Sequence, residues 1–299
     1  ASVSALAGPA GKPPGLAVHG GSATDFGLIE ALRSARPGQP DLELVHRLDR
    51  DTSGCLLVAK RRAALRDLHR QLREGQTEKH YLALVCGKWN LGTKRIELAL
   101  DTDERRSGER HVAVRAHGKK SVSTFKPVQF FGNLATLLEV EIDTGKTHQI
   151  RVHAAHAGHP VAGDDKYGNR IFNGIFKDYG LKRMFLHSSS LGFTRPGTRE
   201  PMLASAPLPP ELSAVLDTLT RGKARAPQDE RGKTLKPEGA RGPIVAPRVQ
   251  RPAPVPQTGK PRIGASRTGS PRADKRGPAK GSGPVRGEGR RRARTTGGR

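Results

Sequence analysis

The chain has little cysteine and no long apolar run, and each shortage excludes a class of protein. Its two cysteines, Cys55 and Cys86, are too few for a disulfide framework and lack the spacing of a zinc knuckle, which favours a reducing compartment. Without about 18 consecutive apolar residues, no transmembrane helix is expected. The start also lacks the charged region and apolar core of a signal peptide. These shortages predict a cytoplasmic protein without a membrane partner.

Acidic residues are also scarce, and the resulting positive charge is concentrated toward one end. Lys and Arg number 53 against 28 Asp and Glu, a net charge of +25. Residues 221–299 hold 22 of the basic and 5 of the acidic residues, and no Phe, Tyr or Trp. Such a segment cannot bury enough apolar surface to offset the entropy of ordering its backbone, which predicts a basic disordered tail. Its partner is either a polyanion, bound through phosphate contacts, or none, and composition supports both equally.

Hydrophobic periodicity predicts one α+β domain over residues 15–220, after a loose Pro- and Gly-rich lead-in at 1–14. The order of elements lacks regular strand–helix–strand units, so we expect a mixed, largely antiparallel sheet flanked by helices and loops. The predicted helices span 26–34, 61–75, part of 144–160 and 211–220. The predicted strands span 16–21 (a short strand and turn), 41–45, 55–60, 79–89, 108–120, 121–131 and 134–143.

The stretch "VHRLDRDTSG", residues 45–54, gathers charged side chains in a predicted loop between two strands. Arg47 and Arg50 flank Asp49, and a neighbouring guanidinium keeps a carboxylate ionised and aimed. Asp51, followed by Thr-Ser-Gly, is typical of a turn in which the carboxylate bonds nearby backbone N–H groups. The two carboxylates therefore do not make a convincing glycosidase pair. From these residues alone, Asp49 is as well explained by a structural ion pair as by catalysis.

Three other kinds of functional site can be tested against the sequence, and none has the residue spacing that it requires. "TGKTH" at 144–148 is no phosphate-binding loop, because Val140 stands where that loop needs glycine. His153, His156 and His159 drift off one helix face and match no known zinc spacing. We expect surface or RNA-facing histidines there, and no metal site. The Gly-x-Ser-x-Gly elbow of serine hydrolases is absent.

Three separated segments resemble the RluA family of pseudouridine synthases, in the family's order. They are "HRLDRDTSG" at 46–54, "KHY" at 79–81 and "TGKTHQIRVH" at 144–153, the last with Lys146 where the family usually has Arg. Residues 157–169 and 184–193 also match in type. The resemblance covers about 15–220 and is closest to a branch that acts on large-subunit ribosomal RNA.

The resemblance implies a pseudouridine synthase fold and an enzyme that isomerises specific uridines to pseudouridine in large-subunit (23S) ribosomal RNA of a bacterium. That reaction cuts the N-glycosidic bond, turns the uracil over and rejoins it through carbon. It involves no net redox change, so no cofactor is expected, and we expect a monomer. The target nucleotide must leave its stack, because the glycosidic carbon is unreachable inside a helix.

The resemblance also implies roles for individual residues. Asp49 is the catalytic carboxylate, acting either as nucleophile at the sugar or as base at C2′. Tyr81 is the tyrosine that stacks on the extruded base and takes part in proton transfer. Arg151 pairs with the catalytic Asp, and Arg47 inserts near the position that the base vacates.

Four more residues are expected to position RNA backbone or the loop, namely His46, Arg50, His148 and Gln149. Structural roles explain these four equally well. Two departures from the family also stand out. Residues before Lys12-Pro13-Pro14-Gly15 do not look like the family's first strand, and the upstream S4-type RNA-binding domain of this branch is missing. We expect a truncated start or a loss of those parts.

Other functions fit parts of the pattern. The same chemistry on other ribosomal or transfer RNA sites is the first alternative. An inactive RNA-binding assembly factor is the second, although a chain without activity has no reason to keep Asp49, Tyr81 and Arg151 together. A nucleoside or glycoside hydrolase is the third, and the lack of a credible second carboxylate weighs against it.

Overall fold

The computed structural model describes seven stretches of the chain, residues 3–6, 11–20, 26–39, 41–104, 110–222, 226–229 and 231–237. All of them lie in the first of two structural units, Ala1–Val249. The predicted disordered tail falls outside the described residues from 238 onward. Within the described part, no helix is both long enough and apolar enough to cross a bilayer.

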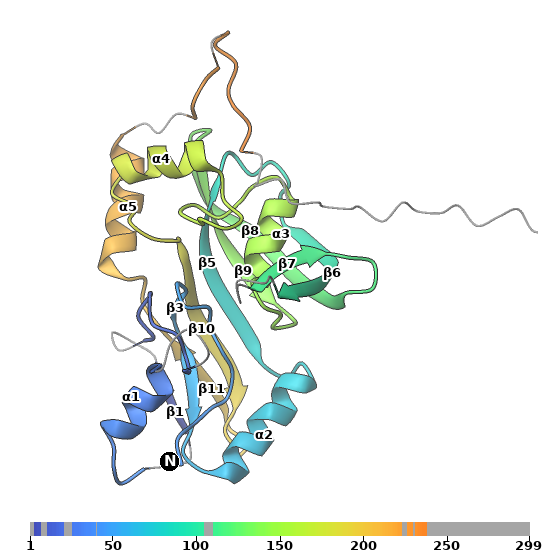
Figure 1. Ribbon diagram of the computed structural model, residues 1–299, viewed down its shortest axis with the longest axis vertical. Helices are drawn as coiled ribbons and strands as arrows, with labels where there is room; N and C mark the ends of the chain where they lie inside the picture. Colours follow the sequence, from blue (N-terminus) through green and yellow to red (C-terminus); the bar gives the residue numbers. More distant parts are fainter. Residues whose placement is uncertain are drawn as a thin grey trace, which may run out of the picture. The chain divides into compact units, whose positions relative to one another are not determined.

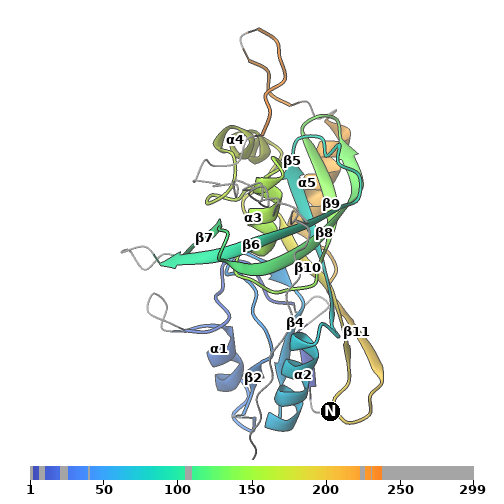
Figure 2. The same ribbon diagram turned by 90° about the vertical axis from the view of Figure 1, so that its right-hand side faces the viewer.

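A large, almost wholly antiparallel sheet forms the centre of this unit (Figures 1 and 2). Its strand order is β11-β10-β5-β9-β8-β6-β7, and the short β3 pairs in parallel with β10. The predicted mixed, largely antiparallel sheet is therefore confirmed. The strands are β3 (Ser53–Gly54), β5 (Glu78–Cys86), β6 (Lys94–Glu104), β7 (Arg110–Val114), β8 (Lys119–Phe131), β9 (Ala135–Ile142), β10 (Leu186–Thr194) and β11 (Pro201–Ser205).

A smaller sheet corrects the expectation for the start of the chain. Its order is β1-β4-β2, with β1 at Val3–Leu6, β4 at Leu56–Ala59 and β2 at Glu43–Leu44. The prediction of a loose lead-in at 1–14 is wrong for β1, which pairs antiparallel with all four residues of β4. Strand formation here depends on the hydrogen-bonding partner that β4 provides, and a local sequence window does not contain that partner.

Five helices occur in the described chain: α1 (Leu28–Ser34), α2 (Arg62–Arg73), α3 (Gln149–His156), α4 (Arg170–Asp178) and α5 (Pro210–Arg221). The sequence predicted all except α4. Asn169 caps α4, because its side chain accepts hydrogen bonds from the N–H groups of Ile171 and Phe172. Gly174 in the middle of α4 weakens the helical signal of that segment.

Helix α3 covers one face of the large sheet, and helices α4 and α5 cover the other. Tyr81 and Val85 of β5 share one buried cluster with Ile150 of α3. Leu84 and Cys86, which point the other way from β5, pack in a second cluster against α4 and α5. Because side chains alternate along a strand, β5 separates the α3 face from the α4–α5 face.

The C-terminal boundary also needs correction. After α5, the described residues 226–229 and 231–237 fold back as a turn in which Leu235 N–H donates to Pro227 O and Asp229 N–H to Lys233 O. Ala226 and Pro237 are buried, so this segment has the apolar anchors that the predicted tail lacked. We therefore propose that the folded domain extends to residue 237.

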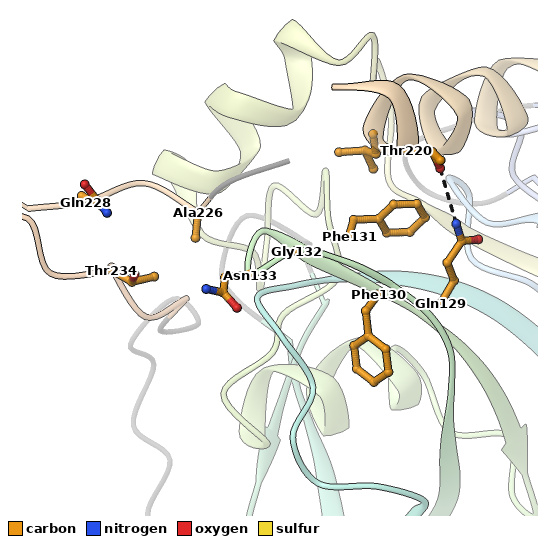
Figure 3. A pocket seen from close by; sticks show the side chains of 10 residues that line it. Gln129, Phe130, Phe131, Gly132, Asn133, Thr220, Ala226, Gln228 and Thr234 are labelled. Atoms are coloured by element: carbon orange, nitrogen blue, oxygen red, sulfur yellow. Dashed lines mark hydrogen bonds between the residues drawn. The ribbon is translucent and has the colours of Figure 1, made fainter. Parts of the chain in front are cut away.

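A pocket of about 550 Å³ lies between this C-terminal turn, the end of α5 and the β8–β9 turn (Figure 3). Gln129 of β8 donates to the Thr220 hydroxyl across its wall at 3.4 Å. None of the residues that line it carries an ionisable side chain. Acid–base chemistry must be sought elsewhere.

We expect the C-terminal turn to stabilise the domain. The free energy of unfolding should be about 1–2 kcal/mol lower for a chain that ends at residue 222 than for one that ends at 237. The shorter chain lacks the apolar surface that Ala226 and Pro237 bury. Thermal melting followed by circular dichroism measures the difference. Equal melting temperatures for the two truncations would restore the boundary at 220.

Candidate active site

The loop that contains the charged cluster connects β2 to β3, and the buried side chain of Lys12 holds it in place. Lys12 is 1% exposed, and its ammonium donates to the backbone carbonyls of Pro13, Leu16 and Arg50. Burial lowers the pKa of Lys12 to about 8. Lys12 also exchanges both backbone hydrogen bonds with Gly54, at 2.9 and 3.0 Å. The segment predicted to be a lead-in thus fixes the loop.

Gly54 ends the loop in a conformation that favours glycine. Its φ is 115°, and a Cβ at this position would collide with the carbonyl oxygen of Ser188 on β10. The close approach lets β3 pair with β10 directly after the loop. The position of Asp49 is therefore set by the large sheet.

Asp49 faces the N-terminal turn of α3. Its Oδ2 lies 3.4 Å from Nη1 of Arg151 and 4.0 Å from Nε2 of His148. The contact predicted between Asp49 and Arg151 is therefore present. The Asp49 side chain is 19% exposed, so a substrate can reach it. Thr52 N–H closes the turn on the Asp49 carbonyl at 3.1 Å.

Arg151 is held mainly by a residue that the sequence did not single out. Asp164 accepts Nε at 2.7 Å and Nη2 at 2.8 Å, and its side chain is fully buried. The guanidinium also lies over the ring of Tyr167, 5.0 Å from its centroid. Burial opposes the charge of Arg151, but the hydrogen bonds and charge of Asp164 outweigh it and raise the Arg151 pKa. The remaining guanidinium nitrogen, Nη1, faces Asp49.

Asp164 is itself satisfied from several sides. Besides Arg151, its carboxylate accepts the backbone N–H groups of Lys166 and Tyr167 at 2.9 and 3.0 Å. Burial alone would raise the pKa of Asp164, but Arg151 and these N–H groups hold it below its usual value. The sequence does not indicate a role for Asp164, because its partner Arg151 lies 13 residues away and helical periodicity does not relate the two.

Tyr81 lines a small pocket beside Asp49. The pocket has a volume of about 70 Å³, and Ile142 and Leu186 form its apolar walls. The Tyr81 hydroxyl is hydrogen-bonded to Ser188, and burial raises the Tyr81 pKa far above its usual value. The ring is therefore neutral and suited to apolar contact.

A wider cleft of about 660 Å³ opens on the other side of the same residues. Arg47, Asp49, His148 and Arg151 line both the cleft and the small pocket. The remaining basic residues of the cleft are Arg50, Lys166, Lys177, Lys182 and Arg183. Lys and Arg outnumber the four aspartates of the cleft, which favours an anionic ligand.

Other predicted site residues have mixed outcomes. Arg47 and Arg50 are exposed at the cleft, as an RNA contact requires. Asp51 contacts Arg50 Nε at 3.4 Å, where bonds to backbone N–H groups were expected. His46 accepts the Leu57 N–H through Nε2 at 3.1 Å, which favours its structural interpretation.

The contacts of Gln149 favour the structural role that the sequence left open beside RNA contact. The residue is 2% exposed, and its amide is used inside the protein. Its oxygen accepts from Thr144 and from the Lys146 N–H, and its nitrogen donates to Val122 O and Ser123 Oγ. Gln149 therefore joins the start of α3 to β8 and has no free group for RNA.

The expectation of exposed histidines after Gln149 is wrong for His153. Its side chain is fully buried, and Nε2 lies 2.8 Å from the Ser121 hydroxyl. His159 is half-buried and contacts the Cys86 carbonyl through Nδ1. In the described chain, no group of three His, Cys, Asp or Glu is arranged to hold a metal ion.

Comparison with known proteins identifies the family. A family described as RNA pseudouridylate synthase matches residues 10–156. Ribosomal large subunit pseudouridine synthase C of Pasteurella multocida is 51% identical over 213 residues, 71% of this chain and 65% of that relative. The proteins of the same name from Salmonella typhi and Escherichia coli are 52% and 50% identical, each over 71% of this chain and 67% of the relative. The chain belongs to the RNA pseudouridylate synthase family, which confirms the resemblance, and it spans about two thirds of the length of these relatives.

Solved structures agree on the fold. Human RNA pseudouridylate synthase domain containing 1 is 26% identical with a TM-score of 0.55, over 74% of this chain and 91% of that one. Human domain containing 4 has a TM-score of 0.57 at 22% identity, over 73% and 89% of the two chains. The expected pseudouridine synthase fold is confirmed.

Asp164→Asn should destabilise the protein by about 3–5 kcal/mol, because it leaves the buried Arg151 without its ionised partner. Asp165→Asn is the matched control, and this exposed position should change stability by less than about 0.5 kcal/mol. Chemical denaturation measures both.

The pH dependence provides a second check. Because folding lowers the pKa of Asp164, its stabilisation is present above its unfolded pKa of about 4 and is lost as pH falls through the folded value. The stability difference between wild type and Asp164→Asn should therefore narrow in acid. A difference that stays constant down to about pH 2 would contradict the ion pair.

Proposed function

We propose that the chain isomerises uridine to pseudouridine in large-subunit ribosomal RNA, with Asp49 as the reacting carboxylate. The observation that carries the proposal is the position of Asp49, between a small pocket with apolar walls and a basic cleft. A nucleotide needs both environments, because its base is flat and mostly apolar whereas its backbone is anionic.

The small pocket supports binding of an extruded base. Tyr81 offers a neutral ring, and Ile142 and Leu186 add apolar contacts. Enzymes that react at a base or its glycosidic bond take the nucleotide out of the stack and hold it against such side chains. We therefore assign Tyr81 to stacking on the extruded base, next to the reacting carboxylate.

The cleft supports binding of the sugar–phosphate backbone. Arg47 is exposed and lines both cavities, so it can reach the space that the base leaves. Lys177 and Lys182 lie farther along the cleft, where phosphates of neighbouring nucleotides would pass. Basic side chains at these positions give affinity and leave sequence recognition to other contacts.

Asp49 reacts with the sugar either as nucleophile at C1′ or as base at C2′, and both routes need an ionised carboxylate. Arg151 stabilises that form from 3.4 Å. The isomerisation is redox-neutral, so the proposal includes no cofactor, and we propose that the protein acts as a monomer. The names of its relatives support large-subunit ribosomal RNA as the substrate.

Asp49→Asn tests the reacting group. The amide keeps the size of the side chain but cannot act as nucleophile or base, so pseudouridine formation should fall below detection. RNA affinity should hold or rise slightly, because one anion leaves a basic cleft. Pseudouridine yield on large-subunit ribosomal RNA fragments is measured together with RNA binding and melting temperature.

Asp51→Asn is the matched control, two residues away in the same loop, and should retain measurable activity. Full activity of Asp49→Asn would overturn the assignment of Asp49. A wild-type protein that binds these fragments but forms no pseudouridine would favour an assembly factor over an enzyme.

The charge of the C-terminal segment predicts a salt effect. Residues 238–299 contain 16 Lys and Arg against 3 acidic residues. Removing them should weaken RNA binding and flatten the dependence of log Kd on log salt, because fewer counterions are released. Fluorescence anisotropy at several salt concentrations measures the slope. An unchanged slope would show that this segment has no polyanion partner.

A further inference from the structure

A chain of polar contacts leads from the β6–β7 hairpin to Asp49 through Tyr167, which has no assigned role, and His148. The backbone N–H of Val112 on β7 donates to the Tyr167 hydroxyl at 2.9 Å. The same hydroxyl lies 2.9 Å from Nδ1 of His148. The other ring nitrogen of His148, Nε2, lies 4.0 Å from Oδ2 of Asp49.

A count of the protons in this chain of hydrogen bonds favours one tautomer of His148. The Tyr167 hydroxyl has one proton and already accepts the proton of Val112 N–H. If His148 Nδ1 also donated to this oxygen, the hydroxyl proton would have no acceptor among the described contacts of Tyr167. Donation from the hydroxyl to Nδ1 satisfies every group, and it leaves the imidazole proton on Nε2, toward Asp49.

The surroundings of His148 support a neutral ring with a fixed orientation. Burial lowers its pKa to about 4, although the charge of Asp49 partly offsets this effect. His148 has a φ of 53°, an uncommon value for a residue with a side chain, so its backbone needs support from its neighbours. Tyr167 supplies an edge-on ring contact at 5.5 Å in addition to the hydrogen bond.

Tyr167 is itself well fixed. Its backbone N–H donates to Asp164, and its ring lies under the guanidinium of Arg151. The next residue, Gly168, leaves no room for a Cβ, which would collide with the Asp164 carbonyl oxygen. The Tyr167 hydroxyl is therefore held at a defined place relative to both donors that face Asp49.

We propose that Tyr167 is a positioning residue that fixes the tautomer of His148, so that Nε2–H of His148 and Nη1 of Arg151 face Asp49 together. The inference rests on the proposed function only for its catalytic consequence. The tautomer can be observed in the protein alone. In the reaction, the two donors orient the ionised carboxylate, and neither competes with it as a base, because neither accepts a proton in this arrangement.

The direct test is ¹⁵N nuclear magnetic resonance of the histidine side chains at neutral pH in the full chain. The His148 signals are assigned by their loss in His148→Gln. Wild type should show the Nε2–H tautomer. Tyr167→Phe keeps the ring but removes the hydroxyl, and it should shift His148 toward a mixture of tautomers. Tyr179→Phe is the matched control at a tyrosine beside α4, and it should leave the His148 signals unchanged.

Kinetics on large-subunit ribosomal RNA fragments supply the second readout. Tyr167→Phe should lower kcat on the order of tenfold, the lower end of the loss known for partners that orient metal-bound histidines, with KM unchanged. Tyr179→Phe should behave as wild type.

The tautomer and the activity test different parts of the proposal. An Nδ1–H tautomer in wild type, or an unshifted His148 in Tyr167→Phe, would overturn the positioning role whatever the activity. Loss of folding in Tyr167→Phe leaves the wild-type tautomer as the deciding measurement. A wild type with the expected tautomer but no pseudouridine formation would contradict the proposed function and not the role of Tyr167 toward His148.

Discussion

The buried ion pair between Arg151 and Asp164 is the interaction on which the site depends. Removing two charges from water is costly and is offset only by good geometry and full hydrogen bonding. Two short bonds join the pair, and two backbone N–H groups satisfy the carboxylate further. Asp164 fixes Nε and Nη2 of the guanidinium. The remaining nitrogen, Nη1, therefore points in a defined direction, toward Asp49.

The sheets bring distant segments to this pair. Asp49 stands on the loop before β3, which pairs with β10, and β10 pairs with β5 beside it. Tyr81 on β5 and the start of α3 therefore meet the loop at one place. Lys12 binds three carbonyls behind the loop, so the first segment of the chain also contributes to the position of Asp49. A displacement of any of these elements would change the distance between Asp49 and Arg151.

Local sequence patterns predicted the helices and strands that have a clear hydrophobic period. They did not predict the elements that form only through pairing with a distant segment. The alternating strand β9 and the amphipathic helix α2 were predicted, since each repeats an apolar pattern over eight or more residues. Strand β1 has four residues and exists through its pairing with β4. Gln149 and His153 have polar side chains that suggested RNA contacts, but β8 supplies buried partners for both. Their burial follows from packing that no local window contains.

The sequence alone was enough to identify the family, the basic charge and three residues that meet at the candidate site. The three motifs contain Asp49, Tyr81 and Arg151. Each of these residues can be recognised because it stands at a fixed position within its motif. The contacts of Asp164 with Arg151 and of Tyr167 with His148 became visible in the folded chain alone. The reason is physical: each pair is separated in sequence by more than a helical turn, and their contact depends on a loop folding back over α3.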